Sequence, residues 1–125
     1  MFISDEMLKE LKNGLDYIGT IDKEKNPYSS FLKLDHHKIR LQLEIKDSII
    51  KTARFKAQSC PIILVTLNRA CSLIEGKHIR DALEVKNYDL IKLFGMEKAE
   101  KEKKKICAEQ SIRICINEYI NRENQ

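Results

Sequence analysis

The stretch that decides the fold is KIRLQLEIKDSIIKTARFKA, residues 38–57. Its first part alternates polar with apolar residues, which is the pattern of a strand with one buried face; the apolar members are Ile39, Leu41, Leu43 and Ile45. After a tight turn at residues 46–48, the alternation resumes over residues 49–57. The stretch therefore predicts an antiparallel hairpin with one face in water.

Weaker signals surround this hairpin on its N-terminal side. Ser4 is a suitable N-cap for a first helix that carries one apolar stripe of Met7, Leu8, Leu11 and Leu15. Residues 18–30 contain Gly, Asp, Asn, Pro and Ser, and we expect a loop there. A short strand at residues 29–33 is expected to add a third member to the sheet.

From Pro61 onward the apolar period becomes helical. Pro61 suits the first position of a helix and Gly76 suits its end, with an apolar stripe between them formed by Ile63, Leu67, Cys71 and Ile74. Short helices are expected at residues 78–83 and 87–94, and a last long helix at residues 99–121 with Ile112, Ile116 and Tyr119 facing inward. The order predicts one α+β domain over residues 1–125, a small three-stranded antiparallel sheet covered on one face by helices.

The composition is that of an ordinary globular protein, with 42% apolar residues and a formal charge of +4. Lys and Glu alternate over residues 97–105, which is typical of a solvated helical face with mutual ion pairs, so we expect no nucleic-acid binding. No apolar run approaches the roughly 20 residues of a membrane helix. The polar opening residues do not resemble a signal or transit sequence. We therefore expect a cytoplasmic protein with no membrane partner.

The four cysteines are expected to be reduced thiols, and none forms a CxxC pair. Cys60 ends the hairpin just before Pro61, at or near a helix N-cap, where the helix dipole favours a thiolate. It is either a reactive or metal-binding thiol or a small residue at a tight corner. Cys71 and Cys115 lie on apolar stripes and are expected to pack in the core. Cys107, near the Lys-rich start of the last helix, either faces the sheet edge or packs.

A second polar cluster, Asp35, His36 and His37, precedes the long strand. Strand alternation would place Asp35 and His37 on one face and His36 on the other. A carboxylate and an imidazole on one face are zinc or iron ligands, but a site needs at least three converging donors. The alternative is a polar turn without a ligand.

Residues 49–60, IIKTARFKAQSC, resemble the IIxDARFKxxGC strand of iron–sulfur cluster assembly scaffolds of the IscU/NifU N-terminal type. The resemblance continues in RLQL at residues 40–43, in EGK at residues 75–77, in DAL at residues 81–83, and in GTID at residues 19–22. It extends from about Leu8 to Tyr119 and implies the scaffold fold. In that family three cysteines, with an aspartate and a histidine, hold a nascent [2Fe–2S] cluster or zinc, and a cysteine desulfurase supplies the sulfur.

Only some of the family's ligands have a counterpart in this sequence. Cys60 matches the middle cysteine, whereas residues 35–37 stand where the family has its first cysteine and its aspartate. Lys103 and Lys104 align with the third ligand region, and Cys107 lies about one helical turn further on. A protonated lysine cannot coordinate a metal, and near Cys60 it would instead stabilise a thiolate. The motif read by a dedicated Hsp70-type chaperone is absent.

Three functional hypotheses follow. The first is a divergent, non-enzymatic scaffold that binds iron, zinc or a [2Fe–2S] cluster through Cys60, with Asp35, His37 and Cys107, and that works with a cysteine desulfurase and client proteins. The second is an interaction module that keeps the scaffold shape to dock a desulfurase or client and holds no cofactor. The third, an enzyme with Cys60 as nucleophile and His36 or His37 as base, matches no recognised motif.

Overall fold

A computed structural model of the chain describes residues 3–124. Its centre is an antiparallel sheet of three strands in the order β1 (Tyr28–Leu34), β2 (His37–Lys46) and β3 (Ile49–Gln58). Two-residue turns join the strands. In the second turn both Asp47 and Ser48 have positive φ, as a type I′ turn requires, and that turn matches the twist of the paired strands.

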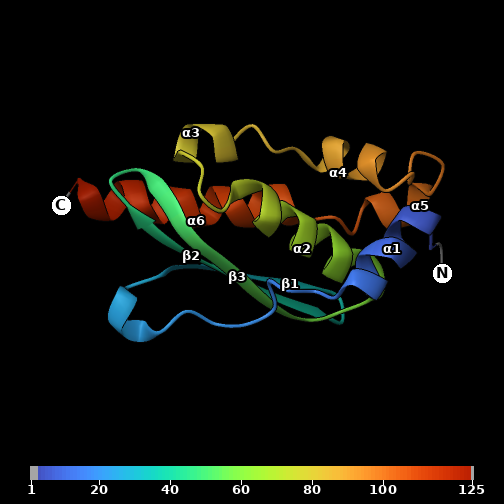
Figure 1. The fold of residues 1–125 in the computed structure, drawn as a ribbon, viewed down its shortest axis with the longest axis horizontal. Coiled ribbons are helices and arrows are strands. Elements are labelled where there is room, and N and C mark those ends of the chain that lie inside the picture. The colour runs from blue at the N-terminus through green and yellow to red at the C-terminus, as the bar shows by residue number, and fades with distance from the viewer. Residues whose placement is uncertain (1–2, 125) are drawn as a thin grey trace.

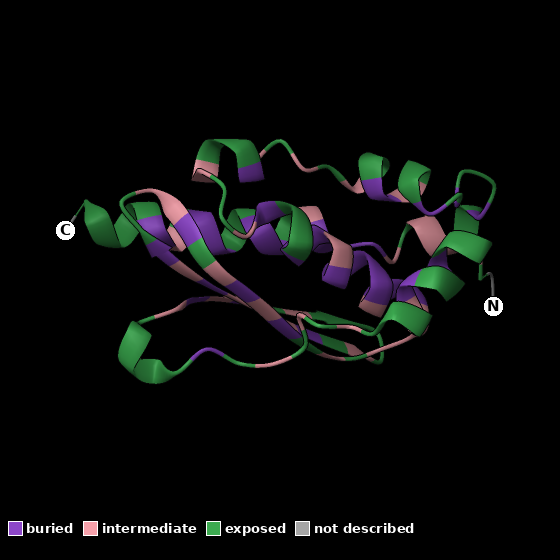
Figure 2. Ribbon diagram, viewed as in Figure 1, coloured by how far each residue is buried: buried purple, intermediate pink, exposed green. Residues whose placement is uncertain are grey.

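Two helices cover one face of this sheet, α2 (Pro61–Ile74) and α6 (Ala108–Glu123), as Figure 1 shows. The inward-facing strand residues and the helix stripes form one buried core (Figure 2). Its members include all the predicted apolar positions of β2 and of α2, which are Ile39, Leu41, Leu43, Ile45, Ile63, Leu67, Cys71 and Ile74. The predicted fold class, an α+β sheet with helices on one face, is confirmed.

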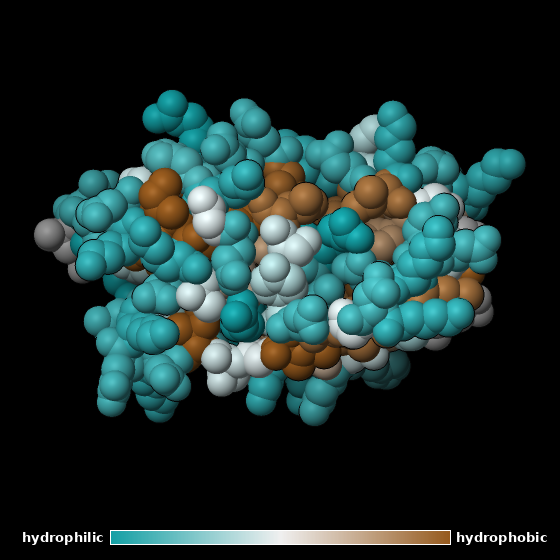
Figure 3. All heavy atoms as spheres, viewed as in Figure 1, coloured by the Kyte–Doolittle hydropathy of each residue, from teal (hydrophilic) through white to brown (hydrophobic). Residues whose placement is uncertain are grey.

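The remaining helices are short and lie around this sandwich. They are α1 (Asp5–Asn13), the 3₁₀ turn η1 (Lys23–Lys25), α3 (Ile79–Ala82), α4 (Asn87–Leu93) and α5 (Glu100–Lys103). As predicted, the Ser4 hydroxyl caps α1 by accepting a hydrogen bond from the Met7 amide. Within residues 3–124 no helix is long and apolar enough to cross a membrane. Hydrophilic atoms cover most of the face in Figure 3, with hydrophobic atoms confined to separate patches.

Two chain segments cover the outer edge of β3. The Tyr17 carbonyl and the Gly19 amide both bond to the backbone of Phe55, at 2.9 Å each. Further along the edge, the Ile50 backbone bonds to Gly76 and Lys77. An exposed strand edge invites pairing with another chain, and these contacts occupy this one. The predicted loop at residues 18–30 is thus partly ordered by strand pairing, and β1 already begins at Tyr28.

The last predicted helix, residues 99–121, is wrong as a single element. The structure has the short α5, then a break, and then α6 from Ala108. Ile106, Cys107 and Ala108 are all buried. The chain leaves the helix between α5 and α6, where the Asn87 side chain bonds to the Ile106 carbonyl and to the Glu109 amide.

Candidate functional site

Cys60 occupies the corner where β3 gives way to α2. It is the N-cap residue of that helix, with extended backbone (φ −88°, ψ 164°), and Pro61 follows as the first helical residue. Its side chain makes no capping hydrogen bond and is partly exposed to solvent. The predicted position at a helix N-cap is confirmed. The thiol is therefore accessible to solvent at the N-terminal end of α2.

His37 lies at the start of β2, close to this corner. Its Nδ1 is 2.9 Å from the Ser59 hydroxyl, and Ser59 directly precedes Cys60. The contact follows from the register, because Lys38 pairs with Gln58 and the next residues outward are His37 and Ser59. The sheet thus holds one imidazole beside the chain segment that carries the thiol.

Asp35 and His36 form the turn between β1 and β2, where Leu34 pairs with His37. Asp35 has a positive φ of 51° and an exposed side chain. The expectation that strand alternation sets the faces of Asp35 and His37 is wrong, because the chain reverses direction at Asp35. Aspartate is one of the few residues that tolerates this left-handed conformation.

Cys107 reaches the same end of the molecule from the other side of the break. It is the N-cap residue of α6 and only 2% exposed. Burial raises the pKa of its thiol to about 11, and negative charge on Cys60 raises the pKa further. The effect of Cys60 on this pKa indicates that the two thiols lie in the same region of the molecule, although they are far apart in the sequence.

The other two cysteines belong to the core, as predicted. Cys71 and Cys115 are fully buried. Burial raises both pKa values, that of Cys115 to about 12. The Cys115 thiol donates a hydrogen bond to the Leu41 carbonyl at 3.5 Å, so it serves the packing of α6 against the sheet.

Lys103 and Lys104, which the sequence resemblance led us to expect in the third ligand region, lie at the end of α5. The Lys103 ammonium is paired with the Glu100 carboxylate at 2.8 Å, an i,i+3 ion pair within the short helix. Lys104 is the C-cap residue of that helix and is exposed. The prediction that this charged run forms a solvated face with internal ion pairs is confirmed for this pair.

The donors at this end differ in chemistry and do not form a closed site. The thiols of Cys60 and Cys107 and the imidazole of His37 are ligands of the kind that zinc and iron–sulfur clusters use. However, among residues 3–124 no three His, Cys, Asp or Glu side chains are grouped closely enough to hold a metal ion. One chain in this conformation offers an incomplete ligand set.

Two polar residues that position the site were not predicted. Ser59 contacts His37. Asn87 anchors the start of α6, since its Oδ1 accepts from the Glu109 amide at 3.0 Å and its Nδ2 donates to the Ile106 carbonyl.

Comparison with known proteins agrees with this arrangement. The family described as "NifU-like N terminal domain" matches residues 17–125. The iron–sulfur cluster assembly protein IscU of Plasmodium falciparum is 34% identical over 105 residues, which are 82% of this chain and 64% of that protein. The chain therefore spans less than two thirds of that relative. The iron–sulfur cluster assembly scaffold protein IscU of Rickettsia prowazekii is 29% identical, with 86% of each chain covered.

Solved structures show the same fold at low sequence identity. A protein of Fervidobacterium islandicum, described as a scaffold for the SUF system, superposes with a TM-score of 0.73 at 16% identity, over 90% of this chain and 94% of that one. The N-terminal part of a NifU-like protein of Brucella abortus gives 0.60 at 13% identity, over 89% and 95%. Since the family match extends over most of its length, the chain belongs to the NifU-like N-terminal domain family.

Proposed function

We propose that this chain is a divergent iron–sulfur cluster assembly scaffold, with residues 1–125 acting as one domain. Its cargo would be iron, zinc or a [2Fe–2S] cluster, bound at a site centred on Cys60. Family membership and the names of the relatives support the general role. The observation that supports the site is that a partly exposed thiol at a helix N-cap, a second thiol at Cys107 and His37 beside Ser59 lie at one end of the molecule.

The ligand set implies that a partner completes the site. A [2Fe–2S] cluster takes four protein ligands, and this end of the chain offers two thiols and an imidazole, with the Asp35 carboxylate on the neighbouring turn. A cysteine desulfurase that delivers sulfur, or a client that accepts the cluster, could supply the missing donor. In this proposal the protein carries its cargo and does not catalyse a reaction of its own.

A second candidate function is a docking module that keeps the scaffold shape and holds no cargo. The lack of any three-donor group within residues 3–124 favours it, as does the engagement of Lys103 with Glu100 at the position aligned with a family ligand. Such a module would bind a desulfurase or client through its surface alone.

Anaerobic reconstitution with iron and sulfide, with and without a cysteine desulfurase, separates the two. The scaffold predicts visible charge-transfer absorption that is stronger with the desulfurase, lost in Cys60→Ser and weakened in Cys107→Ala. Cys115→Ala is the matched control, because that thiol is also buried but bonds to the Leu41 carbonyl of the sheet. A colourless, metal-free protein that still binds the desulfurase would establish the docking module instead. A signal that survives Cys60→Ser would remove Cys60 from the site.

A further inference from the structure

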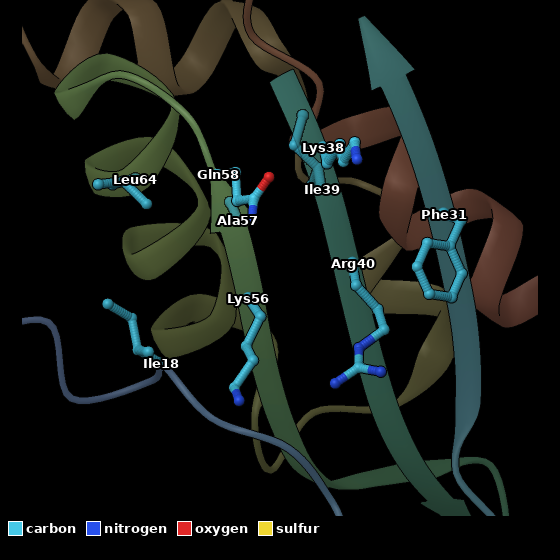
Figure 4. A pocket seen from close by; sticks show the side chains of 9 residues that line it. All are labelled: Ile18, Phe31, Lys38, Ile39, Arg40, Lys56, Ala57, Gln58 and Leu64. Atoms are coloured by element: carbon cyan, nitrogen blue, oxygen red, sulfur yellow. The ribbon is translucent and has the colours of Figure 1, made fainter. Parts of the chain in front are cut away.

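A groove of about 440 Å³ crosses the sheet face that lies away from α6 (Figure 4). It runs from Phe31 on β1, over β2 and β3, to Ile18 and Leu64 beyond the edge of β3. Residues 17–26 pass beside the sheet, where the Ile21 amide bonds to the Gln42 side chain, but they leave this part of the face open. The groove does not include Cys60 or Cys107.

The charged residues that line the groove are all cations. They are Lys38, Arg40 and Lys56, and no Asp or Glu lines it. Within residues 3–124 none of the three takes part in an ion pair. In the register of the sheet, Arg40 lies directly opposite Lys56, and Lys38 lies directly opposite Lys33. Like charges directly opposite each other destabilise a sheet, and an anionic ligand would reduce the repulsion between these cations.

Apolar side chains at both ends give the groove a second property. Phe31 is 72% exposed, and the Arg40 guanidinium lies over its ring at 5.8 Å from the centroid. Ile18 is 47% exposed, yet its backbone is fixed by the pairing of the neighbouring residues with Phe55. Apolar groups held in place on an open surface are typical of a binding site, because little order is lost on binding.

We propose that this groove binds an acidic, extended segment of a partner protein. An apolar side chain of the segment packs against Phe31 at one end of the groove, and carboxylates of the neighbouring residues pair with Lys38, Arg40 and Lys56. Adjacent strands are about 4.8 Å apart, so three strands span about 10 Å, or about three residues of an extended chain. The recognised pattern is thus an apolar residue next to acidic residues. Single-stranded nucleic acid fits less well, since it is bound by several stacked aromatic rings and Phe31 is the one aromatic residue in the groove.

The test uses fluorescein-labelled peptides and the full chain, read by fluorescence anisotropy at low ionic strength. The wild type is expected to bind the acidic peptide GSEELEESG. It should bind the same peptide with serine in place of the central leucine at least tenfold more weakly, and it should not bind the basic peptide GSKKLKKSG. The Arg40→Glu/Lys56→Glu variant is expected to lose at least tenfold in affinity for the acidic peptide and to bind the basic one. Lys23→Glu/Lys25→Glu, with the same change of net charge on the exposed η1, is the matched control and is expected to stay within twofold.

Circular dichroism verifies folding, and Arg40→Gln/Lys56→Gln replaces the double reversal if that variant unfolds. Absence of acidic-peptide binding by the wild type would overturn the proposal, as would equal losses in the groove and control variants. Tighter binding of a twelve-nucleotide oligouridylate, lost in the same groove variant, would show a nucleic-acid surface instead. Cys60→Ser is expected to retain peptide binding, so this result and that of the cluster experiment are independent.

Discussion

Replacing Cys107 by alanine is expected to change how zinc binding depends on pH. A thiol must lose its proton before it can coordinate a metal. Burial raises the pKa of the Cys107 thiol to about 11, against 9.0 for an ordinary cysteine. At neutral pH the free protein therefore holds this proton firmly, and a metal that recruits Cys107 must displace it.

The size of the effect follows from the pKa. Each pKa unit is worth about 1.36 kcal/mol, so deprotonating Cys107 at pH 7.5 costs about 5 kcal/mol, compared with about 2 kcal/mol for an unperturbed thiol. Below pH 11 the Cys107 contribution makes the apparent zinc affinity rise about tenfold for each unit of pH. Removing the thiol should lower the slope of the logarithm of the zinc affinity against pH by one. Zinc binding to Cys107→Ala should then release one proton fewer than zinc binding to the wild type.

Isothermal titration calorimetry with zinc, in two buffers of different ionisation enthalpy at several pH values between 6.5 and 8.5, measures both quantities. Cys115→Ala is the control, since burial raises the pKa of that thiol too, to about 12, but it packs against Leu41 in the core. If wild type and Cys107→Ala release the same number of protons per zinc, Cys107 is not a ligand, and its place at this end of the molecule is structural.

Three predictions concern stability and are measured by urea denaturation. Phe55→Ala, which empties a fully buried aromatic site in the sheet, is expected to lower the free energy of unfolding by about 3–5 kcal/mol; a loss below 1 kcal/mol would show that the core collapses around it. Glu75→Ala is expected to lower the free energy of unfolding by about 1–3 kcal/mol, because the Glu75 carboxylate accepts a hydrogen bond from the Ala53 amide at 2.9 Å. Glu100→Ala removes an exposed ion pair and should leave the urea midpoint of unfolding unchanged. Burial raises the pKa of Cys115 from 9.0 to about 12, so the folded state holds this proton longer than the unfolded state. The resulting stability is complete below about pH 9 and is lost as pH rises towards 12, and a Cys115→Ala variant should show a smaller loss between pH 8 and 10.5.

The sheet and α2 were predictable because each follows from a local rule. Alternation in residues 38–45 identified the buried face, and the structure buries Ile39, Leu41, Leu43 and Ile45 as expected. Pro61 and Gly76 mark the beginning and end of α2, and Gly76 has the positive φ of 86° that favours glycine after a helix. None of these features depends on a distant residue.

The start of α6 was not predictable in this way, because a residue far away in the sequence determines it. Asn87 and Glu109 bond reciprocally, each side chain accepting from the other's backbone amide, at 3.0 and 3.1 Å. This is the chemistry of a helix cap, but the capping side chain comes from the first residue of α4. The sequence of residues 99–121 alone, rich in Lys and Glu, favours one uninterrupted helix.

The same break places a second thiol in the region of Cys60, whereas the lysines before it stay on the surface. In an uninterrupted helix the side chains of Lys103, Lys104 and Cys107 would follow one helical spiral. The chain leaves α5 after Lys103, and α6 begins at Ala108. Cys107 is therefore buried in the protein, while the Lys103 ammonium remains paired with the Glu100 carboxylate. A thiol one turn beyond the expected position is thus brought close enough to respond to charge on Cys60. If Asn87 maintains this break, Asn87→Ala should weaken both the coupling and any metal binding that depends on it, while leaving the exposed thiol of Cys60 in place.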